Sequence, residues 1–258
     1  MLTTILTAAA GGAKNENPYG FWEALQQGGV IAWSVAGILT LMLFVSLYIF
    51  FVKIFEQSKI NAQTKRVRSG FWNLTSLREG AAKLEPNSAY RQIVDDGLAA
   101  QEQHGKLTDP VEAHDWLHGS LARSEATINS SLGGGLAFLA TVGATAPFIG
   151  LFGTVVGIYR ALIKIGSSGD PSIDKVAGPV GEALIMTAFG LVVAVPAVLG
   201  YNFLQRRNKQ IAEDLNAFSN DVLGFLASNG AVRPVTRGAK PAAAPAKPAA
   251  APAKPTAA

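Results

Sequence analysis

One acidic residue lies inside a long uncharged stretch of this 258-residue chain. Glu182 is the only charged residue between Val176 and Gln205. A carboxylate near hydrocarbon is costly unless it is paired, hydrated or protonated, and acids in membrane spans commonly mark ion paths. The alternative is a position near the membrane interface in the first turns after Pro179, where the helix dipole stabilises a negative charge. Glu182 therefore predicts either proton transfer or interfacial stabilisation.

Two hydroxyl side chains, Thr154 and Thr187, also lie in apolar runs. Such hydroxyls usually bond to a carbonyl one turn earlier, so alone they indicate little. Five positions at roughly 100° each place Glu182 and Thr187 about 140° apart on a helix. A shared pore would then need several copies of the chain or a bent helix.

The residue types give little indication of catalysis, metal binding or nucleic-acid binding. The chain has no cysteine, which excludes disulfides, thiolate metal sites and a catalytic thiol. His114 and His118 lack the glutamate of an HExxH site, so they predict a surface pair rather than a metal centre. Neither a phosphate-binding glycine loop nor a Ser/His/Asp set is present, and a net charge of +4 makes no case for nucleic acid. We expect no enzyme activity, no cofactor and no metal.

Three uncharged apolar runs are long enough to cross a membrane. The first has 23 residues, and about 20 helical residues cross a hydrocarbon layer of about 30 Å. The fold class predicted is therefore an all-α polytopic membrane protein with three transmembrane helices. The predicted segments are an amphipathic arm (1–29), span one (30–52), a helical insertion (53–135), span two (136–159), a short loop (160–177), span three (178–204), a C-terminal helix (205–230) and a disordered Ala/Pro/Lys-rich tail (231–258).

Basic residues flank these spans unevenly. Five Lys or Arg follow span one and three follow span three, whereas only Lys14 precedes span one. The excess of Lys and Arg on cytoplasmic flanks predicts an outer N-terminus and a cytoplasmic C-terminus. The insertion is then cytoplasmic, and the loop over 160–177 lies on the periplasmic side.

Capping residues predict the helices outside the membrane. Asn87 or Ser88 suits the start of a helix that ends near Gln103, and Asp109-Pro110 suits the start of another. Asn229-Gly230 suits the end of the C-terminal helix. The predicted apolar face of that helix contains Ile211, Leu215, Phe218, Val222, Phe225 and Leu226.

Small residues recur at steps of three and four in spans two and three. Such stripes let membrane helices approach closely. They predict packing within one subunit, a face lining a cavity shared by several subunits, or both. The positions are Gly143, Ala146, Gly150, Gly153 and Gly157 in span two, and Ala183, Thr187, Gly190, Ala194 and Ala197 in span three.

Spans two and three also resemble a known family. LATVGATAPFIGLFGTVVGIY (139–159) and VAGPVGEALIMTAFGLVVAVPAVLGYN (176–202) are similar to the signature of the MotA/TolQ/ExbB proton-channel family. GATAPFIGLFGTV and the lead-in NPYGFWEAL favour its ExbB branch over TolQ. The insertion and the tail resemble nothing diagnostic.

The resemblance implies a subunit of the bacterial inner membrane that uses the proton gradient with ExbD-like and TonB-like partners. Its activity would energise outer-membrane import of iron–siderophore complexes and similar cargo. It implies a pentamer in membrane lipid around an ExbD dimer, with Glu182, Thr154 and Thr187 along the pore. The carboxylate that titrates would belong to the ExbD helix. The alternatives are a TolQ-type envelope motor and a non-conducting scaffold for ExbD and TonB.

Overall fold

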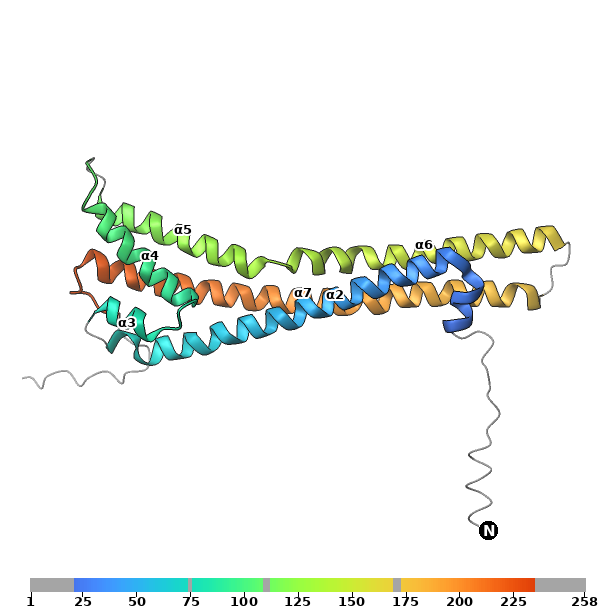
Figure 1. Cartoon of the computed structure of the whole chain (residues 1–258), viewed down its shortest axis with the longest axis horizontal. Helices are drawn as coiled ribbons and strands as arrows, with labels where there is room; N and C mark the ends of the chain where they lie inside the picture. Colours follow the sequence, from blue (N-terminus) through green and yellow to red (C-terminus); the bar gives the residue numbers. More distant parts are fainter. Residues whose placement is uncertain (1–20, 74–75, 109–111, 169–172, 235–258) are drawn as a thin grey trace, which may run out of the picture. The chain divides into compact units, whose positions relative to one another are not determined.

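The computed structural model describes residues 21–73, 76–108, 112–168 and 173–234 (Figure 1). Every regular element in these ranges is helical, which confirms the all-α prediction. The elements are α2 (Phe21–Gly70), η1 (Phe71–Asn73), α3 (Leu77–Lys83), α4 (Ala89–His104), α5 (Ala113–Gly133), α6 (Leu136–Ser168) and α7 (Ile173–Ala227).

Three helical stretches are long and apolar enough to cross a membrane: Gly28–Asn73, Ala113–Ser167 and Gly178–Ala227. They agree with the three predicted spans and are consistent with a membrane protein. A membrane span needs only about 20 apolar residues. The helix itself continues until the backbone or the sequence interrupts it, so these helices extend beyond the apolar runs. The sequence predicts a loop over 160–177, but residues 160–168 form the last part of α6.

The chain forms two compact units. Unit 1 comprises Met1–Lys59 and Ile128–Ala212, and unit 2 comprises Ile60–Thr127 and Glu213–Ala258. Unit 1 contains the apolar parts of α2, α6 and α7. Unit 2 contains α3, α4 and most of α5, with the remaining parts of α2 and α7.

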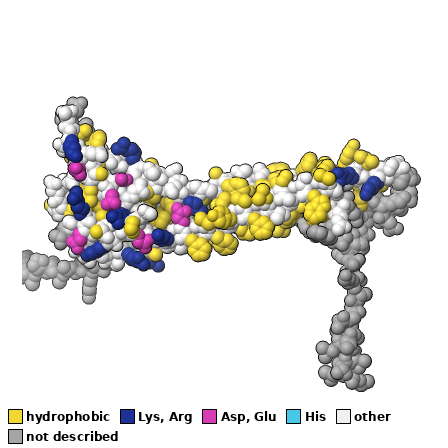
Figure 2. Space-filling view, viewed as in Figure 1, with side chains coloured by type: hydrophobic (Ala, Val, Ile, Leu, Met, Phe, Trp, Pro, Cys, Tyr) yellow, Lys and Arg dark blue, Asp and Glu magenta, His cyan; other side chains and the backbone are white. Residues whose placement is uncertain are grey.

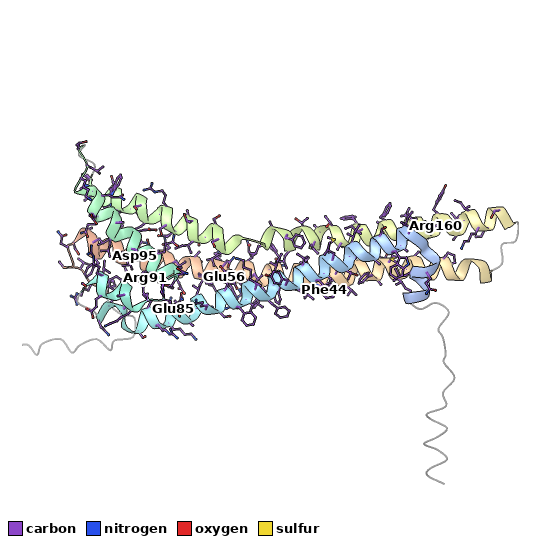
Figure 3. The ribbon with its side chains drawn as sticks, viewed as in Figure 1. Phe44, Glu56, Glu85, Arg91, Asp95 and Arg160 are labelled. Atoms are coloured by element: carbon purple, nitrogen blue, oxygen red, sulfur yellow. The ribbon has the colours of Figure 1, made fainter. Side chains whose placement is uncertain are left out.

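Unit 1 buries small and aliphatic residues between its helices and exposes large apolar ones. Leu39 and Val193 are completely buried, whereas Phe44 is 66% exposed (Figure 3). Figure 2 shows hydrophobic side chains gathered over the apolar parts of the long helices, while Lys, Arg, Asp and Glu gather over unit 2. An apolar outer surface suits a hydrocarbon environment. The main core of unit 1 contains Leu25, Ala32, Val35, Ala36, Leu39, Val142, Ala146, Met186, Val193, Ala194 and Ala197.

Two glycines with positive φ interrupt the helices of unit 1. Gly29 (φ 58°, ψ −152°) kinks α2, so Phe21–Gly28 and the residues from Val30 onward form two helical pieces. Gly135 (φ 81°) lies between α5 and α6, and a Cβ there would be 3.0 Å from Cγ2 of Ile49. Side chains other than hydrogen disfavour these backbone angles. Both glycines thus determine where the helices change direction.

The capping prediction for α4 is confirmed. The Ser88 side chain accepts a hydrogen bond from the Arg91 amide at 3.1 Å, and α4 ends at His104. The predicted start at Asp109-Pro110 lies outside the described residues, and α5 begins at Ala113. Further along α4, Arg91 pairs with Asp95 at 3.3 Å (Figure 3).

The predicted end of the C-terminal helix is also confirmed. α7 ends at Ala227, and Asn229 and Gly230 adopt positive φ values of 51° and 84°. The Gly230 amide donates to the Phe225 carbonyl at 2.8 Å, which satisfies one of the last carbonyls of the helix. Five of the six residues assigned to the apolar face are buried and Phe225 is half-buried.

Aromatic residues form the centre of unit 2. Phe218 packs edge-to-face against Phe71 and Tyr90, with ring centroids 5.2 and 5.1 Å apart. The Tyr90 hydroxyl donates to Thr64 Oγ1 at 2.8 Å. Burial raises the pKa of Tyr90, so the phenol stays neutral and keeps this hydrogen bond. The cluster fixes α4 against α2 and α7 within this unit.

Candidate functional site

The backbones of α6 and α7 meet at Gly150 and Gly190. A Cβ on Gly150 would lie 2.7 Å from the Met186 carbonyl oxygen and 3.1 Å from the Gly190 Cα. A Cβ on Gly190 would lie 2.7 Å from the Ala146 carbonyl oxygen. Only glycine fits on both sides of this crossing, and close backbone approach increases dispersion packing between membrane helices.

The other small residues of the stripes extend this contact in both directions. A Cβ on Gly143 would meet Val198, one on Gly153 would meet Met186, and one on Gly157 would lie 3.2 Å from the Ala183 Cβ. These contacts lie within one subunit. A role in lining a cavity shared by several subunits stays a prediction. Ala146, Ala183 and Ala194 are all at most 4% exposed.

Thr154 and Thr187 lie together across the same contact. Thr154 Oγ1 is 2.9 Å from the Ala183 carbonyl oxygen and 3.2 Å from the Gly150 carbonyl oxygen, and it also makes a short contact with Thr187 Oγ1. Both threonines are only half-buried. For Thr154 the expected bond to a carbonyl one turn earlier is therefore present, and a bond to the neighbouring helix accompanies it. The two hydroxyls form one polar contact between α6 and α7.

Glu182 lies in α7, one residue before Ala183. Its side chain is outside the described part of the structure. The backbone nevertheless places Glu182 beside the residue whose carbonyl Thr154 binds. Thr154 and Thr187 therefore belong to the α6–α7 contact, and the place of Glu182 in that contact stays a prediction.

Arg160 is a polar residue of this region that the sequence interpretation missed. The sequence predicts a polar loop here, but Arg160 lies in α6 and is half-buried (Figure 3), and its guanidinium donates to the Gly28 carbonyl. The kink at Gly29 interrupts the helical hydrogen bonding of α2 at this point, and Arg160 donates to the carbonyl that is left without a helical donor. Two features of the sequence could have indicated this contact. Arg160 directly follows an uncharged run, and Gly28-Gly29 can interrupt a helix.

A second missed residue, Gln57, ties α2 to α7 in unit 1. Its side chain is completely buried, and Nε2 donates to the Leu204 carbonyl at 3.0 Å and to Asn208 Oδ1 at 2.6 Å. Asn208 Nδ2 in turn donates to the Leu132 carbonyl at 2.9 Å. The amides therefore connect three helices at the end of the apolar region opposite to Thr154.

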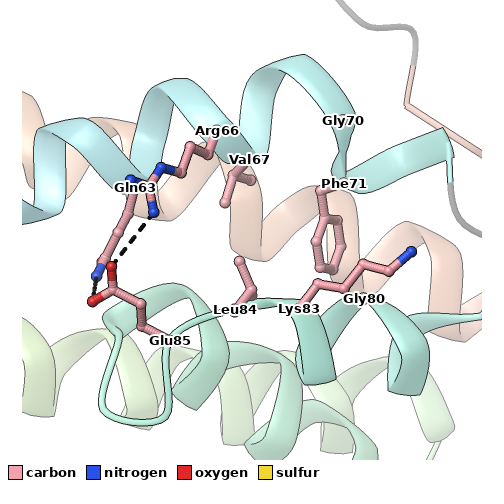
Figure 4. Close-up of a pocket in the computed structure, with 9 residues that line it drawn as sticks. All are labelled: Gln63, Arg66, Val67, Gly70, Phe71, Gly80, Lys83, Leu84 and Glu85. Atoms are coloured by element: carbon pink, nitrogen blue, oxygen red, sulfur yellow. Dashed lines mark hydrogen bonds and ion pairs between the residues drawn. The ribbon is translucent and has the colours of Figure 1, made fainter.

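Unit 2 contains a separate pocket of about 310 Å³ beside Phe71 (Figure 4). Glu85 accepts a hydrogen bond from Gln63 at 3.1 Å and lies 3.6 Å from Arg66, so residues of α2 hold the segment that follows α3. A Cβ on Gly80 would lie 2.6 Å from the Phe71 ring, which fills the space beside that glycine. These contacts are those of a packing joint between α2 and α3.

The histidine pair lies on the surface of α5 in unit 2. The rings of His114 and His118 stack with centroids 6.3 Å apart. Across the described ranges, no group of three or more His, Cys, Asp or Glu is placed to hold a metal ion.

Comparison with known proteins identifies the family. A profile described as the MotA/TolQ/ExbB proton channel family matches residues 85–217, about half of the chain, including α6 and the part of α7 that packs against it. The chain belongs to the MotA/TolQ/ExbB proton channel family. This confirms the resemblance noted in spans two and three, and it assigns the chain to a class of membrane transport proteins.

Individual members of this proton channel family are similar over most of the chain. Biopolymer transport protein ExbB of Xanthomonas campestris pv. campestris (strain B100) is 35% identical, over 90% of this chain and 100% of that protein. Biopolymer transport protein ExbB of Neisseria gonorrhoeae is 41% identical, over 66% and 79% respectively. Tol-Pal system protein TolQ of Pseudomonas aeruginosa is 31% identical, over 60% and 70% respectively.

Proposed function

We propose that this chain is an inner-membrane proton-channel and stator subunit of an ExbB-type system. With an ExbD-like and a TonB-like protein it uses the proton motive force to energise outer-membrane import of iron–siderophore complexes and similar cargo. The observation that carries the proposal is the 35% identity to a protein named ExbB, which extends over that protein's whole length.

In this proposal Glu182 attracts and relays protons, and Thr154 and Thr187 continue the path. A hydroxyl both donates and accepts hydrogen bonds, so neighbouring hydroxyls can pass a proton along a chain. The contact between the two threonines and the bond from Thr154 to the Ala183 carbonyl support this assignment. The carboxylate that takes up and releases the proton belongs to the ExbD-like partner.

The surrounding helices serve as the stator in this mechanism. The close α6–α7 crossing at Gly150 and Gly190 supports a stiff wall, since neither backbone can move toward the other. Five copies would surround a dimer of the ExbD-like partner. The N-terminus would be periplasmic and the C-terminus cytoplasmic, in the predicted segment order.

A second candidate is a TolQ-type subunit of an envelope motor, which the 31% identity to TolQ of Pseudomonas aeruginosa favours. A third is a scaffold that assembles partners without conducting protons. Both alternatives keep the same three-helix architecture. The TolQ-type subunit differs from the ExbB-type proposal in the partner that it binds. The scaffold differs in needing no ionisable side chain at position 182.

Complementation separates these candidates. The chain is expressed with its co-purifying ExbD-like partner in cells that lack their own ExbB-type protein, and siderophore uptake is measured beside partner co-purification. We expect wild-type uptake to be restored, Glu182→Ala to abolish uptake while retaining the partner, and Glu182→Asp to retain part of the activity. Glu213→Ala, which removes an exposed acid elsewhere on α7, is the matched control and should leave uptake unchanged.

Each alternative has a distinct outcome. Restoration of envelope integrity in cells lacking TolQ, without siderophore uptake, would establish the TolQ-type function. Loss of uptake only in proportion to lost co-purification would establish the scaffold. Normal uptake by Glu182→Ala would remove this residue from the mechanism.

A further inference from the structure

Each of the two threonines at the α6–α7 contact lies between two large aliphatic residues of its own helix. In both helices one aliphatic residue lies three positions before the threonine and another lies four positions after it. At about 100° per residue, all of them fall within roughly 60° of the threonine of their helix. The hydroxyls therefore have an aliphatic side chain one turn to either side. These residues are Leu151 and Ile158 around Thr154, and Leu184 and Leu191 around Thr187.

Leu151 and Leu191 lie at one level of the α6–α7 contact. Each directly follows one of the two glycines that meet there, Gly150 and Gly190. Both leucines are 49% exposed, so half of each side chain is available to something outside the single subunit. They form the inner pair, which the predicted topology places on the cytoplasmic side of the threonines.

Ile158 and Leu184 form a second pair, on the other side of the threonines. Each directly follows one of two residues in close contact, since a Cβ on Gly157 would lie 3.2 Å from the Ala183 Cβ. Both side chains are exposed. Over the described segments 143–158 and 183–198, the threonines are the only polar residues within about 80° of this face of α6 or α7. The hydroxyl contact is therefore a small polar site with an apolar section on either side.

Apolar sections of this kind discriminate between the forms in which a charge can move. Water is unstable in a narrow hydrophobic constriction, and a hydrated ion loses its hydration shell there at high cost. A protonated carboxyl group is neutral, so it passes such a section at much lower cost than a carboxylate or a metal cation. An apolar section next to a hydroxyl pair thus favours a proton carried as a neutral acid over any ion in water.

We propose that the inner pair, Leu151 and Leu191, is the seal of the pore. The proposal rests on the proposed function, which places Thr154 and Thr187 along the pore and the titrating carboxylate on the ExbD-like partner. The hydroxyls exchange a proton with that carboxyl group, and the two leucines prevent a water chain from carrying protons past it. The inner pair also excludes hydrated metal cations. Proton passage then depends on the partner's carboxylate and is not a leak.

Proton leak through the reconstituted complex tests the seal. The chain is purified with its ExbD-like partner and placed in liposomes that contain the pH indicator pyranine, and a potassium diffusion potential drives protons inward. Leu191→Asn should raise the leak at least about tenfold over wild type, because an amide holds water where the leucine excludes it. Leu199→Asn is the matched control. Leu199 is an exposed leucine of α7 about 120° from Thr187, and its variant should stay within about twofold of wild type.

Three further variants separate a broken seal from a broken complex. Leu151→Asn changes the other leucine of the inner pair and should raise the leak similarly, whereas Leu191→Met keeps an apolar side chain of similar volume and should not. Co-purification of the partner is measured for every variant, and the smaller change Leu191→Ser replaces Leu191→Asn if that complex does not assemble. A wild-type leak rate in the assembled polar variants, or an equal rise in Leu199→Asn, would overturn the proposal.

Complementation distinguishes a failure of the seal from a failure of the proposed function. Siderophore uptake by the wild-type chain, together with no leak in the polar variants, rejects the seal alone. A leak in the polar variants without uptake by the wild-type chain supports the seal and rejects the ExbB-type function.

Discussion

Replacing Gly150 by alanine tests how closely α6 and α7 approach. The new Cβ would lie 2.7 Å from the Met186 carbonyl oxygen and 3.1 Å from the Gly190 Cα. Both are backbone atoms, so no side-chain rotation relieves the clash. Ordinary contact begins at 3.4 Å, and the helices must therefore separate by about 0.7 Å at the crossing.

The expected cost follows from this displacement. Overpacking of this kind destabilises by about 1–3 kcal/mol. A glycine-to-alanine change inside a helix also contributes a gain of about 1 kcal/mol from helix propensity. Gly166 is the matched control, because it lies in the same helix and a Cβ there meets nothing within 4 Å. The difference between Gly150→Ala and Gly166→Ala therefore isolates the overpacking cost.

Thermal unfolding of the purified variants measures this difference. About 1–3 kcal/mol in a chain of this size corresponds to a midpoint roughly 2–10 °C lower for Gly150→Ala than for Gly166→Ala. The separation should also weaken the bond from Thr154 to the Ala183 carbonyl. Equal midpoints for the two variants would show that the helices do not meet at Gly150, and the argument for a stiff wall would be wrong.

Three other substitutions test single polar contacts. Arg160→Met should lower the unfolding midpoint by leaving the Gly28 carbonyl unsatisfied, at about 1–3 kcal/mol, and Arg160→Lys should recover part of the loss; equal midpoints for the Met variant and wild type would contradict the contact. Gln57→Ala should cost about 2–4 kcal/mol in the same assay, since it leaves a cavity and removes the donor to Asn208 Oδ1 and to the Leu204 carbonyl. Ser88→Ala should cost about 1 kcal/mol and speed hydrogen exchange in the first turn of α4, whereas Ser88→Asn should retain the cap.

Several helix boundaries could be predicted because their causes are local. The Ser88 cap and the end of α7 at Asn229-Gly230 depend on a few neighbouring residues. Arg160 shows the limit of this approach. Its polarity placed it in a loop, because the carbonyl that it satisfies is 132 positions away and becomes available only where Gly29 kinks α2.

The sequence by itself determined that the chain is helical and has three membrane-length segments. Inside hydrocarbon a backbone must satisfy its own hydrogen bonds, so an uncharged run of about 20 residues has one stable form. Only the tertiary structure decided which residues of those helices meet. The small residues at 143, 146, 150, 153 and 157 predict that another helix approaches α6 closely. The rotation and axial offset of α7 decide that Gly150 meets Gly190 and that Thr154 meets Thr187. Rotation and offset result from packing between segments distant in the sequence, and periodicity within one helix carries no information about them.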